Sequence, residues 1–296
     1  MPVAPTVVGD NAPMSRLRSG LAAAATALAA ACVLLVPGAA QAAPFPVTTN
    51  PDEAIAAHYL GPATESPAGS NRFGCRDREG RDPIVLLHAT AMNQSANWAY
   101  LAPTLANAGY CVFSTTYGQA SWSGTTGGLG NKERSARQVA PFIDKVLAAT
   151  GASKVDLIGH SQGGAIAQLV TQLPGRAAQV DTIIALSASH QGFSRVGSIT
   201  DRLPARAPGQ SYWGPRHPSI DYVNFATRYD EISTPYQVTL MTPGPNVVNI
   251  LVQDVCPASK IGHVGMAYSP TVAALVRNAL DPDHRVPVVC GSDYPF

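Results

Sequence analysis

The feature that most constrains this chain is a glycine-rich turn between an apolar strand and a helix. Residues 155–164 read Val-Asp-Leu-Ile-Gly-His-Ser-Gln-Gly-Gly, and a helical pattern follows at once. A serine at the apex of so sharp a turn has strained backbone angles, and only glycine-sized residues two positions before and after it leave room. Gly159 and Gly163 stand there. The turn exposes the Ser161 hydroxyl at the positive end of the helix, so we predict that Ser161 is a nucleophile.

Such a serine needs a general base, and the base needs an acid that orients it. In enzymes built on this turn, the acid and then the histidine follow the serine in the chain. His263 lies in a glycine-flanked loop before the last helical pattern, and we predict that it is the base. His284, in a polar tail beyond that helix, is predicted to be a surface residue. His160 adjoins the serine, but its ring should point beneath the turn, where it packs or forms a hydrogen bond.

The acid is expected just after a strand, between Ser161 and His263 in the sequence. Asp230 fits because it follows an apolar strand pattern, and Glu231 and Asp254 compete with it. Exposed carboxylates are common on protein surfaces, so position alone leaves the choice among these three open.

An attacked carbonyl develops negative charge that two N–H groups can stabilise. In this kind of turn one donor belongs to the residue after the serine, which is Gln162, and the other to the loop after an earlier strand. That loop begins at His88 and contains Thr90, whose hydroxyl offers a third hydrogen bond. We predict that Thr90 and Gln162 form this oxyanion hole. The alternative for Thr90 is a turn residue without such a role.

Apolar runs of strand length alternate with amphipathic helical patterns along the chain. Strands alternating with helices at this spacing imply right-handed crossovers and a mostly parallel sheet with helices on both faces. The predicted fold class is therefore α/β. Strands are predicted at 83–88, 110–113, 154–158, 180–186, 222–226 and 247–255, and helices at 51–60, 97–108, 134–150, 164–173 and 270–280.

The stretch 190–221 interrupts this alternation with glycine, proline, arginine and aromatic residues. In a compact domain so long an irregular segment is usually functional. It leaves the sheet after strand 180–186, at the edge where open α/β sheets bind ligands. We predict that it caps or lines a substrate pocket with the apolar surfaces of Phe193, Tyr212 and Trp213. The alternative is a solvated surface excursion.

The first 42 residues are predicted to lie outside the fold. Arg16 and Arg18 precede an apolar run at 21–36, and residues 40–42 read Ala-Gln-Ala. This pattern is typical of a secretory signal peptide cleaved near Ala42, whereas a membrane anchor needs a longer apolar run. Met14 is an alternative start to Met1. Cleavage leaves 296 − 42 = 254 residues, which suits one domain at 43–296.

Net charge and cysteine content limit the classes of partner and the covalent links expected for the mature chain. The whole chain carries a net charge of +1, and residues 1–42 hold two arginines and one aspartate, so the remainder is neutral (+1 − 1 = 0). Neutrality gives no reason to expect nucleic acid or an acidic membrane as partner. An even number of cysteines in an exported chain predicts two disulfides. The sequence has no Cys-x-x-Cys spacing, which argues against a zinc site. The four cysteines after residue 42 are Cys75, Cys111, Cys256 and Cys290.

These motifs together resemble the secreted bacterial triacylglycerol lipases of the class 2 lipase group, and more distantly the fungal lipase B enzymes. The matching stretches fall in family order at 84–90, 98–118, 159–164, 227–235 and 252–263. The resemblance implies an α/β-hydrolase fold, and it favours Asp230 as the acid and His263 as the base. It also implies the disulfides Cys75–Cys111 and Cys256–Cys290. The family's usual His-Gly after the first strand is His88-Ala89 here, which leaves the fine geometry at Thr90 open.

The resemblance implies a secreted serine ester hydrolase that acts by two-step acyl transfer on esters of apolar acids, with triacylglycerols as the family's substrates. The substrate is an ester or lipid, at a lipid–water interface in the lipase case. No metal, organic cofactor or stable membrane anchor is expected. Alternatives on the same triad are a carboxylesterase, a polyester hydrolase or an acyltransferase. A secreted binding protein on the same scaffold is the alternative from another class.

Overall fold

The computed structural model describes residues 43–61, 65–191, 213–291 and 293–295, and residues 43–296 form one compact unit. The signal peptide predicted at 1–42 lies outside the described residues, as does most of the stretch 190–221.

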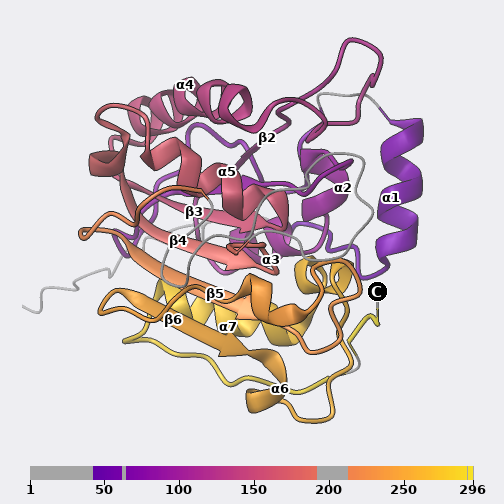
Figure 1. Ribbon diagram of the computed structural model, residues 1–296. Coiled ribbons are helices and arrows are strands. Elements are labelled where there is room, and N and C mark those ends of the chain that lie inside the picture. The colour runs from indigo at the N-terminus through magenta and orange to yellow at the C-terminus, as the bar shows by residue number, and fades with distance from the viewer. Residues whose placement is uncertain (1–42, 62–64, 192–212, 292, 296) are drawn as a thin grey trace, which may run out of the picture. The chain divides into compact units, whose positions relative to one another are not determined.

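A six-stranded parallel sheet forms the centre of this unit (Figure 1), as the alternating pattern predicted. Neighbouring strands follow the order β2-β1-β3-β4-β5-β6, and every pair is parallel. All carboxyl ends therefore meet at one edge of the sheet. The strands are β1 (Ile84–Leu87), β2 (Val112–Thr115), β3 (Val155–His160), β4 (Val180–Leu186), β5 (Asp221–Ala226) and β6 (Val247–Leu251).

Helices cover both faces of the sheet (Figure 1). Successive side chains of a strand point to opposite faces, so β1 divides its residues between two cores. Val85 and Leu87 pack with α4 (Lys132–Thr150) and α5 (Gln162–Thr171). Ile84 and Leu86 pack with α3 (Leu101–Asn107) and α7 (Pro270–Leu280). Burial on both faces explains why β1 reads as a continuous apolar run.

The shorter elements lie around this three-layer core. They are α1 (Pro51–Leu60), α2 (Gln94–Trp98), α6 (Val252–Val255), and the 3₁₀ turns η1 (Arg176–Gln179), η2 (Tyr236–Thr239) and η3 (Val264–Ala267). In the part of the chain that the structure describes, no helix is both long enough and apolar enough to span a bilayer.

Two predicted elements are wrong in extent. The helix predicted at 97–108 is divided into α2 and α3, because Pro103 has no N–H to donate to the carbonyl of Ala99. That carbonyl instead accepts a hydrogen bond from the backbone of Thr48, at 3.2 Å. The strand predicted at 247–255 ends at Leu251, opposite Ala226, where the pairing with β5 ends, and the chain turns into α6.

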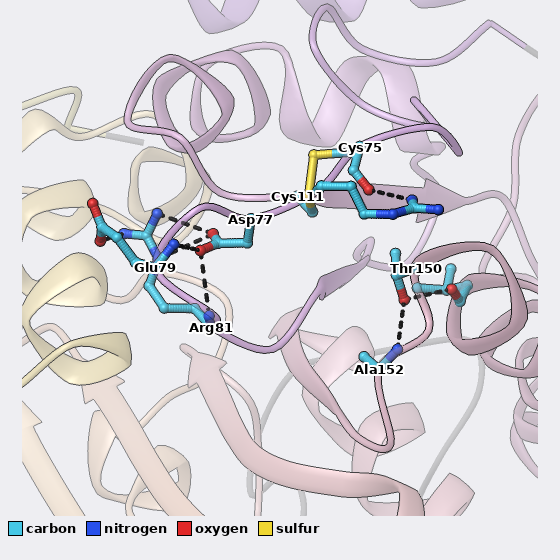
Figure 2. The surroundings of a disulfide bond; sticks show 9 residues. Cys75, Asp77, Glu79, Arg81, Cys111, Thr150 and Ala152 are labelled. Atoms are coloured by element: carbon cyan, nitrogen blue, oxygen red, sulfur yellow. Dashed lines mark hydrogen bonds and ion pairs between the residues drawn. A yellow bond between two sulfur atoms is a disulfide. The ribbon is translucent and has the colours of Figure 1, made fainter.

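Both disulfides have the pairing that the resemblance implied, Cys75–Cys111 and Cys256–Cys290. The first joins the segment before β1 to the residue before β2. Figure 2 shows the chain beside it, where the Arg81 Nε donates to the Asp77 carboxylate at 3.0 Å. On the chain-entropy model, closing loops of 36 and 34 residues stabilises the fold by about 4 kcal/mol each.

Candidate active site

Ser161 occupies the turn between β3 and α5 in a strained conformation. Its φ is 53° and its ψ is −118°, a combination that side-chain-bearing residues rarely adopt. Its backbone N–H donates to the carbonyl of Leu186 at 2.8 Å, which fixes the turn to β4. The strained turn predicted around Ser161 is therefore present.

The glycines beside Ser161 permit this turn because no side chain fits at their positions. A Cβ at Gly159 would lie 2.2 Å from the backbone nitrogen of Gly164, and a Cβ at Gly163 would lie 1.9 Å from the carbonyl oxygen of Leu87. These neighbours are main-chain atoms that cannot move aside. The start of α5 is thus pressed against the end of β1.

His263 and Asp230 form a buried pair. The Nδ1 of His263 lies 2.9 and 3.0 Å from the two carboxylate oxygens of Asp230, and both side chains are buried. The backbone N–H groups of Ser233 and Ile232 donate to the same carboxylate at 2.6 and 3.1 Å. Burial by itself would raise the pKa of Asp230, but the bonds from His263 and Ser233 lower it below its usual value. The carboxylate is therefore held ionised beside the imidazole.

The two competing carboxylates have other partners. Glu231 accepts the backbone N–H of His263 at 2.9 Å, and Asp254 forms an exposed ion pair with Arg228 at 2.8 Å. The structure thus brings Asp230, and neither competitor, to the ring of His263. Asp230 follows β5, and Ser161 follows β3, at the same carboxyl edge of the sheet.

The loop after β1 lies beside the first turn of α5. The Gln162 side-chain Nε2 donates to the Thr90 hydroxyl oxygen at 2.9 Å and to the Gly128 carbonyl at 3.1 Å. Within the described residues, neither the Thr90 N–H nor the Gln162 N–H donates a hydrogen bond. Gln162 is the first residue of α5, and the first N–H groups of a helix have no acceptor inside the helix. Both N–H groups are therefore candidates for the oxyanion hole.

His88 supports this loop, a role that the sequence analysis missed. Its ring is fully buried and stacks on the ring of Tyr117, with centroids 4.1 Å apart. Its Nδ1 lies 2.8 Å from the Ala89 carbonyl, and its Nε2 accepts the backbone N–H of Tyr117 at 3.2 Å. Burial lowers the pKa of His88 to about 4, so the ring is neutral and fixes the chain just before Thr90. Its place at the end of a buried strand was the available signal.

Two other histidines, His160 and His284, have the surroundings that were predicted. The His160 ring lies beneath the turn and contacts Asn97 and His263 through its two nitrogens. His284 is exposed and bonds to Asp281 at 3.0 Å.

The predicted cap is described only at its ends. Phe193 and Tyr212 lie outside the described residues, so their role in the pocket remains a prediction. Trp213 is buried, and its indole Nε1 donates to the Ser189 carbonyl at 2.7 Å. The Lys132 ammonium lies 5.5 Å from the centre of its ring.

Among the described residues, one group of carboxylates lies close enough together to hold a cation. It comprises Asp82, Asp156 and Asp181, at the amino ends of the strands, opposite Ser161. Lys154 pairs with Asp181 at 2.5 Å. Burial, with smaller contributions from Asp82 and Asp181, raises the pKa of Asp156 to about 8. A protonated Asp156 weakens this group as a ligand set.

The chain is similar to known lipases in sequence and in fold. Residues 81–200 match the lipase (class 2) family. Triacylglycerol lipases of Pseudarthrobacter phenanthrenivorans and Burkholderia plantarii are each 34% identical over 137 residues, which is 44% of this chain. This match spans 40% and 36% of those two proteins. The crystal structure of Aspergillus fumigatus lipase B superposes with a TM-score of 0.56 at 22% identity, covering 77% of this chain and 57% of that one.

The chain has the α/β-hydrolase fold. Its resemblance to the class 2 lipases covers β1 to β4 and the turn at Ser161. The segments that carry Asp230 and His263 lie beyond the matched residues, so their assignment depends on the geometry given above.

We expect the substitution His88→Gln to make the protein less sensitive to acid. The folded protein keeps His88 neutral down to about pH 4, whereas the unfolded chain takes up the proton near pH 6.5. The contribution of His88 to the free energy of unfolding is therefore complete above pH 6.5. It is lost as the pH falls toward 4, by about 1.4 kcal/mol per pH unit. Urea unfolding at pH 7.5, 6, 5 and 4.5 measures the slope. Asp156 contributes a slope of opposite sign in both proteins, so it cancels in the comparison. Equal slopes for variant and wild type would contradict the neutral, buried state of His88.

Proposed function

We propose that this protein is a secreted serine ester hydrolase that cleaves esters of apolar acids, triacylglycerols among them. The observation that carries the proposal is the buried His263–Asp230 pair at the sheet edge where the strained Ser161 turn lies. The likeness to triacylglycerol lipases supports the substrate class. Two disulfides and the signal-peptide pattern support secretion.

The reaction begins with attack by the Ser161 Oγ on the ester carbonyl, while Nε2 of His263 accepts the hydroxyl proton. Asp230 accepts the Nδ1–H of His263, which leaves the lone pair on Nε2 and stabilises the imidazolium that forms. His263 then gives its proton to the departing alkoxide. The alcohol departs, and the acyl group remains bonded to the Ser161 Oγ. Water attacks the acyl group with His263 again as base, and collapse of the second intermediate returns the proton to Ser161 and releases the acid.

The N–H groups of Thr90 and Gln162 supply the oxyanion hole. Because Gln162 Nε2 donates to the Thr90 hydroxyl oxygen, the hydroxyl hydrogen is directed elsewhere and can serve as a third donor. Removing one such donor typically raises the barrier by about 3–4 kcal/mol. The side-chain bond also keeps the two donor-bearing segments together before substrate binds.

Rates on a chain-length series test this function. We expect the wild type to hydrolyse p-nitrophenyl esters from butyrate to palmitate and also emulsified triolein. The substitutions Ser161→Ala and His263→Ala should each lower kcat by about 10⁴-fold or more. His284→Ala, a change to an exposed histidine, is the matched control and should retain full activity.

Each contrary outcome has a distinct meaning. Full activity of Ser161→Ala would overturn the acyl-enzyme mechanism. Hydrolysis confined to short soluble esters would identify a carboxylesterase, and release of acid from a polyester film but not from triolein would identify a polyester hydrolase. Preferential transfer of the acyl group to an added alcohol in water would identify an acyltransferase.

Contact with a lipid–water interface is supported by an uncharged loop beside the site. The loop that joins β2 to α4 (Figure 1) begins at the sheet's carboxyl edge, and residues 112–131 contain no Asp, Glu, Lys or Arg. A Cβ at Gly128 would lie 2.8 Å from the Ala89 carbonyl. This loop therefore touches the loop after β1 that contains Ala89 and Thr90, which we call the oxyanion loop. Trp122 on it is 78% exposed. Tryptophan favours boundaries between apolar and aqueous phases.

We expect Trp122 to enter such an interface. The other two tryptophans, Trp98 and Trp213, are buried, so a blue shift of tryptophan emission on adding phosphatidylcholine vesicles reports mainly on Trp122. Trp122→Ala should abolish the shift and lower the rate on emulsified triolein severalfold, while the rate on p-nitrophenyl butyrate stays unchanged. Val248→Ser, at a 53% exposed apolar residue of the edge strand β6, is the control. Equal loss on both substrates, or no shift in the wild type, would contradict the interfacial role.

A further inference from the structure

His160 joins three parts of the candidate site that come from distant segments. It is the last residue of β3, directly before Ser161, and it is buried. Its Nε2 lies 2.9 Å from the backbone carbonyl oxygen of His263, and its Nδ1 lies 3.0 Å from Oδ1 of Asn97. The same Asn97 oxygen accepts the backbone N–H of Ala89 at 3.0 Å. Ala89 directly precedes Thr90, so the chain of contacts reaches the oxyanion loop.

We propose that His160 is a positioning residue. It holds the loop of His263 and the oxyanion loop of Thr90 in place relative to Ser161. This inference rests on the proposed function of Ser161 and His263. His160 is bonded covalently to Ser161, and its two ring nitrogens contact the segments that carry the other two components. A displacement of about 1 Å between reacting groups can cost as much as a hundredfold in rate, so a direct link among these segments has a kinetic effect.

The surroundings of His160 show that it does not act as a general base. Both of its ring partners are oxygen acceptors, whereas a neutral imidazole carries a single N–H. In either tautomer the ring therefore donates to one of them and makes only a contact with the other. Burial, aided by the nearby His263, lowers the pKa of His160 to about 3. The ring of Trp98 packs against it edge-on, with centroids 6.4 Å apart. His160 therefore remains neutral and immobile while His263 exchanges protons.

The bridge divides into two arms that substitutions can separate. Asn97→Ala removes the arm to the oxyanion loop and leaves the contact with the His263 carbonyl. His160→Phe removes both arms and keeps a planar ring of similar size. His160→Gln restores a neutral side chain with one donor and one acceptor group. His284→Phe, a change to an exposed histidine outside these three segments, serves as the control.

Steady-state kinetics on p-nitrophenyl butyrate test the proposal. We expect His160→Phe to lower kcat by about 10- to 100-fold with KM within twofold of wild type. Asn97→Ala should lower kcat less, and the double variant should be no slower than His160→Phe, because both changes interrupt one chain of contacts. His160→Gln should recover at least half of the lost rate on a logarithmic scale. All rates are expressed per folded active site, with thermal unfolding measured on each variant.

A role confined to stability predicts a lowered Tm for His160→Phe and an unchanged kcat per folded enzyme, and that result would overturn the proposal. Additive losses in the double variant would also overturn it, because the two arms would then act independently. These failures differ from failure of the proposed function, in which Ser161→Ala retains activity whatever happens at His160.

Discussion

The close approach of main-chain atoms at Gly159 and Gly163 is the constraint on which the candidate site depends. Because no Cβ intervenes, α5 begins against the end of β1 rather than a side chain's width away. This contact sets the strained angles of Ser161. It also brings the first N–H of α5, on Gln162, next to the loop of Thr90, where the two side chains bond. The proposed nucleophile and the proposed oxyanion donors are thus placed by one packing contact.

Two neutral histidines, His88 and His160, support the segments that meet at that contact. Burial lowers the pKa of His88 to about 4 and that of His160 to about 3. Each ring uses its nitrogens to fix loops at the carboxyl edge of the sheet. His263, paired with the ionised Asp230, is the one of these three histidines that is bonded to a carboxylate. This difference supports the proposed roles, in which His263 transfers the proton and its neighbours position it.

The sequence predicted those features that depend on residues close together in the chain. The turn at Ser161 is encoded by neighbouring glycines, and the ranges of α1, β4 and α7 follow from local patterns. The choice of Asp230 over Glu231 needed the family resemblance, because adjacent carboxylates after one strand look alike until the base is placed. The helix break before α3 was visible in Pro103 but was not predicted.

The contacts of His160 could not be predicted in the same way. Its partners Asn97 and His263 are 63 and 103 positions away in the chain, and no periodicity links residues so far apart. They meet because α2, β3 and the loop before η3 converge at one sheet edge. For the same reason, the support that His88 gives to the oxyanion loop became evident only when Tyr117 was found stacked on its ring.

The central claim is that Ser161 is a nucleophile activated by His263 and Asp230. Labelling with a fluorophosphonate, followed by digestion and mass mapping of the modified peptide, tests it most directly. We predict a single adduct on Ser161, formed at a rate that falls at least a thousandfold in His263→Ala and stays unchanged in His284→Ala. An adduct on another serine, or labelling of Ser161 that proceeds equally fast without His263, would contradict it.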